Sequence, residues 1–438
     1  MGMRKIVLVT LGSLGDLHPY LAVAGALRNH GDYVTIVTHP HYKELVEKGG
    51  FSFIPMRPGP DDVGPVDLWM KQANDPLRGT EFIVRKLILP YIEDNYQVLM
   101  EATEYCDLII SHLLTFAAPL VAEKRGIPWV SCVLQPSALF SAFDPPLLGS
   151  LTLFEGVRFL GPFFHKMIFN LVSRSTRSLF LPVFALRERE GLPVIKENQL
   201  IRYFSPYRTM ALFPEHFATQ QPDWPKNLCQ VGFPLYGKTE IVNLPDPLLK
   251  FIANGPAPFV FTLGSAVVQM ESNFFEVACE AVKKSGIRAI FLTGDNPKNI
   301  PAEATYNLRI YLSEYESFAA LFPLCKAVVH QCGVGTTSQA LSAGLPQILV
   351  PFAHDQPDNA LRVKKLGLGI NLPAKRLTVE RLTNAINEIQ KNESYSRKAV
   401  SLAQLFDNSN FNKNVVEALD DFAKIKDLTH SVRKRTVG

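Results

Sequence analysis

The sequence predicts an α/β protein built from two similar, doubly wound parallel-sheet domains, each Rossmann-like, that face each other across a cleft. In the first half, short apolar strand-like runs alternate with segments of helical periodicity. The same alternation begins again at residue 259. Glycine-rich turns directly follow a strand-like run in each half, at residues 12–16 and 333–337. Ligands of such proteins bind at the carboxyl ends of the strands, where these turns lie.

The first half contains five short apolar runs that we expect to be strands, and three segments that we expect to be helices. Because the runs are apolar on both faces, they indicate a buried parallel sheet with helical crossovers. The strands are predicted at residues 6–11, 33–38, 51–54, 108–111 and 129–133, and the helices at 19–30, 80–104 and 116–125.

The second half repeats this pattern after a proline-rich segment. Strands are predicted at residues 259–263, 288–292, 327–329 and 347–350. We therefore expect an N-terminal domain at 1–240, a linker at 241–257 and a C-terminal domain at 258–405. Residues 406–438 are expected to form a C-terminal helix and a basic tail, with the helix packing back on the N-terminal domain.

Composition excludes several classes of protein. The chain has 438 residues, 47% hydrophobic and 20% charged, and a net charge of +4, which is ordinary for a folded protein and too small to imply nucleic acid. Six scattered cysteines without metal-ligand spacing favour a reducing cytoplasm over disulfides or zinc. No apolar run reaches the length of a transmembrane helix. The basic tail is expected to be solvated, with contact to an anionic membrane surface as the alternative.

Residues 139–184 are unusually aromatic and contain few carboxylates. Helices that pack into the core of the N-terminal domain are one interpretation. The other is an apolar substrate pocket or a surface that contacts a membrane, and the two interpretations are compatible. Phe140 and Phe143 are the candidates for an acceptor pocket.

The segment after the strand at 327–329 has the chemistry of a nucleotide-sugar site. A strand, a tight turn with Gly333 and Gly335, and a following helix aim backbone N–H groups at an anion, helped by the helix dipole. The next strand delivers Asp355 and Gln356 to the same edge of the sheet. An acidic and an amide side chain beside a phosphate site suit sugar hydroxyls, so a bound nucleotide sugar is predicted.

These motifs resemble those of the family 1 glycosyltransferases with the GT-B fold, and the resemblance extends over nearly the whole chain. Gly333–Thr337, Gly344-Leu345-Pro346, Pro351-Phe352 and Asp355-Gln356 carry it. The segment is most similar to bacterial rhamnosyltransferase-type and sterol-type members. The resemblance implies a donor of the UDP-sugar or dTDP-sugar type and no metal or other cofactor.

The resemblance also assigns donor-binding roles. It implies that the turn binds the diphosphate, with a Thr336 or Thr337 hydroxyl, that Asp355 and Gln356 bind the transferred sugar, and that Ser265 lies near the phosphates and Tyr315 near the base. Two positions depart from the family: Gln331 replaces a usual histidine, and Gln339 replaces the glutamate that binds ribose hydroxyls in plant members. Without that carboxylate, a deoxyribose (dTDP) donor competes with UDP.

Asp16 and His112 are the predicted catalytic pair. Asp16 occupies the position where relatives carry a catalytic histidine or aspartate, and His112 aligns with the residue that orients it. We expect Asp16 to contact the acceptor hydroxyl and His112 to tune or relay its proton. Taken alone, each has a structural explanation, a helix cap for Asp16 and a satisfied core histidine for His112. His18 is a third candidate, for the acceptor pocket.

The predicted function is therefore inverting, metal-independent transfer of a hexose to a hydroxyl of a hydrophobic small molecule or lipid. A nucleotide-sugar epimerase on the same scaffold and a non-catalytic nucleotide-sugar-binding helper are the alternatives. The helper predicts the loss of the Asp16 and His112 pair, yet both residues are present. No oligomeric state follows from the sequence.

Overall fold

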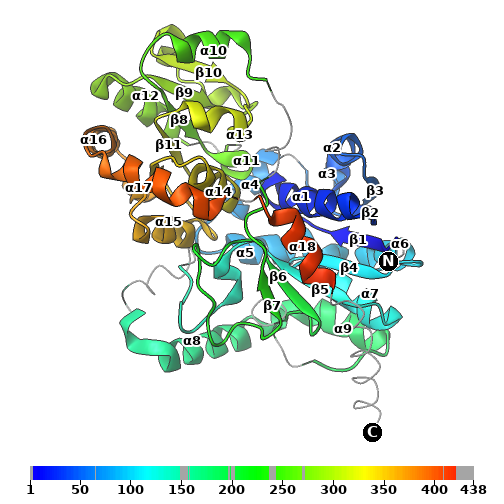
Figure 1. Cartoon of the computed structure of the whole chain (residues 1–438). Coiled ribbons are helices and arrows are strands. Elements are labelled where there is room, and N and C mark those ends of the chain that lie inside the picture. Colours follow the sequence, from blue (N-terminus) through cyan, green and yellow to red (C-terminus); the bar gives the residue numbers. More distant parts are fainter. Residues whose placement is uncertain are drawn as a thin grey trace.

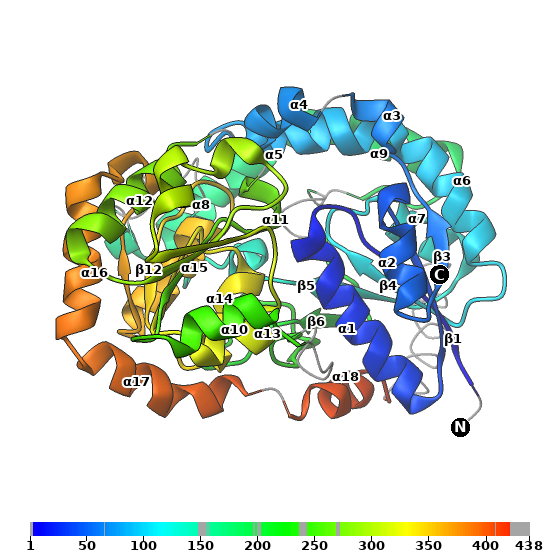
Figure 2. The ribbon, with the colours of Figure 1, turned by 90° about the horizontal axis from the view of Figure 1, so that it is seen from above.

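The computed structural model describes residues 3–64, 66–147, 156, 158–195, 198, 203–235, 243–268, 272–407 and 409–420. They form two α/β units side by side, each a parallel sheet with helices on both faces (Figures 1 and 2). The prediction of two doubly wound parallel sheets is confirmed.

The first sheet has seven parallel strands in the order β3-β2-β1-β4-β5-β6-β7. Most of its central strands are buried along their whole length, as expected for strands covered by helices on both faces. The strands are β1 (Lys5–Val9), β2 (Tyr33–Thr38), β3 (Ser52–Pro55), β4 (Leu108–His112), β5 (Trp129–Val133), β6 (Arg208–Ala211) and β7 (Leu228–Gln230).

The second sheet has six parallel strands in the order β10-β9-β8-β11-β12-β13. The strands are β8 (Phe259–Thr262), β9 (Ala289–Leu292), β10 (Ile310–Ser313), β11 (Ala327–His330), β12 (Gln347–Leu349) and β13 (Gly369–Asn371). The strand order reverses between β1 and β4 in the first sheet and between β8 and β11 in the second. Such reversals open a crevice at the carboxyl ends of the strands, which is where ligands of doubly wound sheets bind.

Two predicted helices differ from the structure. Helix α1 (Leu14–His30) begins five residues before the predicted start at Pro19, because Ser13 and Asp16 form a capping box that starts the helix there. The segment predicted as one helix at 80–104 is helical from residue 79 to residue 102, but it is not a regular α-helix. It consists of α5 (Gly79–Phe82), a π-helical stretch (Ile83–Ile88), a 3-10 turn that contains Pro90 (Leu89–Tyr91) and α6 (Ile92–Ala102), since proline cannot continue the hydrogen bonding of an α-helix.

Part of the predicted linker is helical. Pro245 is the N-cap of α10 (Asp246–Ala253) and Pro247 lies in its first turn, where a missing N–H costs nothing. Leu248 of this helix is buried with Val260 and Ile290 of the second sheet. This part of the segment therefore packs with the second unit.

The chain returns to the first unit at its C-terminal end. Helix α18 (Phe411–Asp420) packs along α1, with Phe411, Val415 and Leu419 in the core of the first unit (Figure 1). A further apolar cluster joins the two units, with Phe213 and Phe233 of the first packed with side chains of the second such as Leu349. The basic tail at 421–438 lies outside the described residues.

Ion pairs and hydrogen bonds also bridge the units. Arg362 of α15 (Gln356–Lys365) pairs with Asp144 of the first unit at 2.7 Å and with Asp358 of its own helix at 2.7 Å. The Leu147 N–H donates to Asp358 at 3.1 Å. Among the described residues, no helix has both the length and the apolar character needed to cross a bilayer.

Candidate active site

The turn after β1 places Asp16 at the strand-order reversal of the first sheet. Ser13 caps α1, and Asp16 Oδ2 accepts hydrogen bonds from the Ser13 N–H at 2.8 Å and the Ser13 hydroxyl at 3.1 Å. Gly12 has a φ of +135°, and a Cβ there would overlap the Asp16 carboxyl group. The turn therefore fixes one carboxylate oxygen and leaves Oδ1 for other partners.

His112, the last residue of β4, is the nearest basic partner of that oxygen. Its Nε2 lies 3.8 Å from Asp16 Oδ1, too long for a direct hydrogen bond but close enough for strong electrostatic coupling. Burial lowers the pKa of His112, and the Asp16 carboxylate opposes this shift. The structure thus brings together the two residues predicted as the catalytic pair, with the imidazole neutral at neutral pH.

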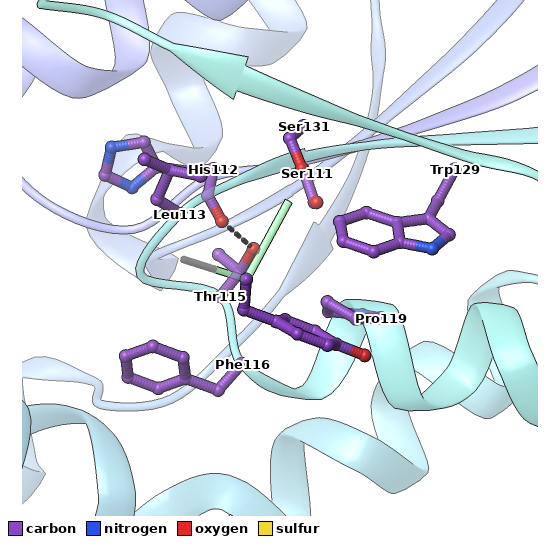
Figure 3. Close-up of a pocket in the computed structure, with 9 residues that line it drawn as sticks. Ser111, His112, Leu113, Thr115, Phe116, Pro119, Trp129 and Ser131 are labelled. Atoms are coloured by element: carbon purple, nitrogen blue, oxygen red, sulfur yellow. Dashed lines mark hydrogen bonds between the residues drawn. The ribbon is translucent and has the colours of Figure 1, made fainter. Parts of the chain in front are cut away.

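The end of β4 is held in place by its own turn. The Thr115 hydroxyl donates to the His112 carbonyl at 2.6 Å (Figure 3). Behind it lies a cavity of about 10 Å³, lined by Ser111, Trp129, Ser131 and neighbouring side chains. Since successive strand residues point to opposite faces, Ser111 faces this cavity, whereas the His112 ring makes an edge contact with Tyr20 of α1.

His39, which no sequence motif singled out, braces the Asp16 turn. Its Nε2 accepts from the Gly12 N–H at 3.2 Å, and its Nδ1 donates to the Pro58 carbonyl at 2.8 Å. The Tyr42 hydroxyl donates to the Gly12 carbonyl at 3.2 Å. The signal was available, because His39 follows β2 and therefore reaches the same edge of the sheet as Asp16.

In the second unit, Gln331 lies between two glycine turns at the other strand-order reversal. Its amide packs against Gly264, after β8, and Gly333, after β11, and Gly264 has a φ of +63°. Cys332 is also left-handed, with a φ of 73°. The Gln331 Oε1 is buried and has no hydrogen-bond partner among the described residues. Gln331 thus links the two turns in which Ser265 and Gly333 lie.

Gly333 is the N-cap of α14 (Val334–Ser342), and no side chain caps that helix. The first N–H groups of the helix therefore remain available to an anion. Gly335 is exposed, whereas Thr336 and Thr337 are buried. The Thr337 hydroxyl has no partner in the described part of the chain. Gln339 lies one turn further along the helix and is half-buried.

Neighbouring His330 has a structural role. Its Nδ1 accepts from the Cys332 N–H at 3.1 Å, and its Nε2 donates to Gln347 Oε1 at 2.9 Å. Burial lowers its pKa to about 4. The neutral ring therefore connects β11 and β12 beneath the turn.

Asp355 and Gln356 begin α15, but they have different surroundings. Gln356 Oε1 accepts from the Phe352 and Ala353 N–H groups at 2.8 and 3.2 Å, so its carbonyl oxygen is used within the loop. Burial raises the pKa of Asp355 to about 7; Asp16 and Asp358 add to this shift, and a 2.7 Å hydrogen bond from Asn359 opposes it.

His354, in the loop between β12 and α15, contacts the first unit. It has a φ of 55°, its Nδ1 lies 3.3 Å from the Thr80 hydroxyl of α5, and its ring packs against Gly79. Burial lowers its pKa, while the backbone of Ala73 and the charge of Asp16 oppose this shift. Asp16 therefore acts electrostatically on residues of both units.

Three further predicted residues lie on other segments. Ser265 is exposed in the short helix α11 (Gly264–Val267), which contacts α1 of the first unit (Figure 2). Tyr315 is 69% exposed beyond β10. His18 is half-buried in α1, and burial lowers its pKa to about 4.

The two aromatic candidates for the acceptor pocket lie elsewhere in the first unit. Phe140 lines an open cavity of about 710 Å³, and the lining of that cavity includes neither Asp16 nor His112. Phe143 is 44% exposed, with the Lys166 ammonium 5.3 Å from its ring centre. The structure does not bring these two residues to the Asp16 turn.

Among the described residues, no group of three His, Cys, Asp or Glu side chains could hold a metal ion.

Two facing Rossmann-like units, with a carboxylate–histidine pair at one strand reversal and a glycine turn at the other, define the GT-B class of glycosyltransferases. Solved structures agree on the fold. The glycosyltransferase of kitacinnamycin matches with a TM-score of 0.70 at 17% identity, covering 97% of this chain and 100% of that one. The calicheamicin glycosyltransferase CalG4 matches with a TM-score of 0.68 at 16% identity, covering 97% and 98%.

Sequence comparisons identify the family. Residues 6–142 match the glycosyltransferase family 28 N-terminal domain, and residues 298–421 match the C-terminal domain of erythromycin biosynthesis protein CIII-like proteins. A Streptomyces fradiae O-mycaminosyltylonolide 6-deoxyallosyltransferase is 26% identical over 98% of this chain and 99% of its own length. A Pichia angusta sterol 3-beta-glucosyltransferase is 26% identical over 90% of this chain but only 32% of its own length. The chain belongs to the family 1 GT-B glycosyltransferases. It spans about a third of the yeast sterol enzyme that it matches.

Proposed function

We propose that the chain is an inverting, metal-independent glycosyltransferase that moves a hexose from a UDP- or dTDP-sugar to a hydroxyl of a hydrophobic small molecule or lipid. One observation carries the proposal. Asp16 Oδ1 lies 3.8 Å from His112 Nε2, and the same carboxylate acts electrostatically on Asp355 of the opposite unit. A candidate base and a candidate sugar-binding carboxylate therefore face each other between the two units.

The acceptor proton is the first part of the reaction. Asp16 Oδ2 is held by Ser13, so Oδ1 is the oxygen open to an acceptor hydroxyl. Asp16 is also the more accessible of the pair, with 29% of its side chain exposed against 7% for His112. The proton passes from the acceptor hydroxyl to Asp16 Oδ1, and His112, 3.8 Å away, tunes the basicity of that carboxylate. The acceptor oxygen then bonds to the anomeric carbon as the bond from that carbon to the diphosphate breaks, which inverts the centre.

The leaving diphosphate is the second part. The uncapped start of α14 offers the N–H groups of Val334, Gly335 and Thr336, together with the positive end of the helix dipole. Preorganised donors of this kind stabilise negative charge where it develops, so backbone groups take the role that a metal has in other transferases. The Thr337 hydroxyl lies at the same turn, where it is buried and has no hydrogen-bond partner among the described residues.

The names of related proteins indicate which acceptors and donors to expect for this chain. The relatives named above act on sterols and on a macrolide, both bulky apolar alcohols. The glycosyltransferase VinC was solved in complex with dTDP and matches with a TM-score of 0.64. Together they support an apolar alcohol as acceptor and keep dTDP-sugars beside UDP-sugars as donors.

Incubation with UDP-glucose or dTDP-rhamnose and a panel of sterol, macrolide, lipid and phenolic alcohols tests the proposal, with mass spectrometry for glycosides. We expect at least one glycoside and stoichiometric release of nucleoside diphosphate. Tight nucleotide binding without any glycoside would indicate the helper protein instead. Conversion of the nucleotide sugar to its epimer without release of diphosphate would indicate the epimerase.

A further inference from the structure

Helix α8 (Gly161–Ser175) carries apolar side chains on its outer face, where a surface helix normally carries polar ones. Phe163 is 86% exposed, Met167 53% and Leu171 67%. Their four-residue spacing aligns them on one face, as a stripe about 12 Å long. Figure 1 shows α8 along the lower edge of the first unit, far from the second sheet.

The opposite face of α8 is fully packed. His165 is buried, and its Nδ1 lies 2.8 Å from the Ala142 carbonyl. Phe169 is 2% exposed and makes an edge contact with Phe140. The helix is therefore anchored by its inner residues, and folding of this chain does not require the outer apolar stripe.

The charges around the stripe have one sign. Residues 156–187 contain no aspartate or glutamate. Lys166 and Arg174 are exposed on the outer side of α8, and exposed Arg177 follows the helix. Arg158 is already neutralised by Asp144 at 2.6 Å. Apolar side chains bordered by exposed cations suit a surface that offers both hydrocarbon and negative charge.

We propose that α8 docks on an anionic lipid bilayer, with Phe163, Met167 and Leu171 inserted among the headgroups and Lys166 and Arg174 on lipid phosphates. A second feature agrees with this assignment. Lys166 and Asn170 also line the open cavity of about 710 Å³ that includes Phe140. Docking through α8 places this cavity at the lipid surface.

Co-sedimentation of the full chain with vesicles tests the proposal without reference to activity. One set of vesicles is phosphatidylcholine mixed with phosphatidylserine, and the other is phosphatidylcholine alone. We expect binding to the mixed vesicles and a loss of at least about tenfold for the triple variant Phe163→Ser, Met167→Ser, Leu171→Ser. The double variant Lys166→Gln, Arg174→Gln should weaken binding about fivefold per cation, which corresponds to about 1 kcal/mol each.

The matched control removes apolar side chains that are equally exposed but lie on the second unit. Tyr306 and Leu308 are 86% and 95% exposed, and the variant Tyr306→Ser, Leu308→Ser should bind as the unchanged protein does. Thermal unfolding of each variant establishes that it is folded.

Three results would overturn the proposal. The first is no binding by the unchanged protein. The second is full binding by the triple variant, which would assign binding to another basic segment such as the C-terminal tail. The third is a concentration-dependent dimer that the triple variant abolishes, which would assign the stripe to a second copy of this chain.

Discussion

The two strand reversals, one on a side of each unit, present different chemical groups. The side formed by the first unit relies on titratable side chains: Asp16 and His112 face each other, and His39 braces their turn. The side formed by the second unit relies on backbone and amides: an uncapped helix start at Gly333 and the Gln331 amide between two glycines. The difference matches the two tasks of glycosyl transfer, because a proton must be moved on one side and a diphosphate must only be held on the other.

The strongest test of this contrast removes the negative charge of Asp16 in the first unit. Asp16→Asn should lower kcat about 10²–10⁴-fold, the usual contribution of a general base, while the KM for the donor stays unchanged. The asparagine oxygen can still accept from Ser13, so we expect α1 to keep its cap. Steady-state kinetics and thermal unfolding measure the two effects separately.

Asp62 provides the control, because it accepts from the N–H of the N-cap residue Gly59 at α3 (Pro60–Val63), just as Asp16 accepts from the N–H of the N-cap residue Ser13. Asp62→Asn should leave kcat unchanged. An Asp16→Asn enzyme with full kcat would remove Asp16 as the base.

The second test disturbs the backbone on the other side. Gly264→Ala forces a Cβ into the Gln331 amide and should lower kcat/KM for the donor by up to about a hundredfold, the effect of a displacement near 1 Å. Gly286→Ala is the matched control, since Gly286 has a similar φ of +68° and open space around its Cβ. Both variants should lose about 1 kcal/mol of stability through backbone strain. Only Gly264→Ala should also lower kcat/KM for the donor. Equal kinetics for the two would contradict a role for the Gln331 contact.

The third test concerns Asp355, a strongly perturbed carboxyl group of the second unit. The pKa of Asp355 is about 7 in the folded protein and near the ordinary value of about 3.9 when unfolded. Between these values only the folded state holds the proton, so its stability falls as pH rises from about 4 to about 7.

Asp355→Asn removes this penalty. The variant should gain stability over the unchanged protein by on the order of 2 kcal/mol more at about pH 8 than at about pH 5. Urea unfolding at both pH values measures the gain. Asp246→Asn, at an exposed position in α10, should show the same small change at both. A gain that does not depend on pH would show that Asp355 is not perturbed.

The smallest expected effect concerns the preference between UDP and dTDP. Gln339→Glu restores the carboxylate that plant relatives place on the ribose, and it should shift binding toward UDP over dTDP by about tenfold, or about 1.5 kcal/mol for a charged hydrogen bond. Calorimetry with both nucleotides measures the ratio. Gln390→Glu, on exposed α16 (Val379–Lys391), adds the same charge elsewhere and should leave the ratio unchanged.

Sequence patterns predicted the structural features that depend on residues close together in the chain. The strands at 33–38 and 129–133 agree with β2 and β5 residue for residue, because they are apolar runs bounded by clear breaks. Asp16 and His112 were paired on the family resemblance, and they lie close together because both follow or end neighbouring parallel strands, β1 and β4, at the same edge of the sheet. The roles assigned to them and to the donor residues stay predictions.

What the sequence did not predict depends on contacts between distant segments. Gln331 was predicted as a donor-site residue, but the packing of its amide against Gly264, from a different strand end, was not predicted. The high pKa of Asp355 results from burial among residues of both units, which no local pattern encodes. The long helix at 80–104 was predicted from periodicity, and Pro90 interrupts it.

The return of α18 to α1 has a consequence for how the chain is made. Phe411, Val415 and Leu419 belong to the same apolar core as Ile6 and Leu8, so the first unit is completed only after the second unit has been synthesised. The face of α1 that α18 covers therefore stays uncovered until the second unit has been synthesised. Any chimera that exchanges the donor halves of two such enzymes must therefore cut the chain twice and keep α18 with the parent of α1.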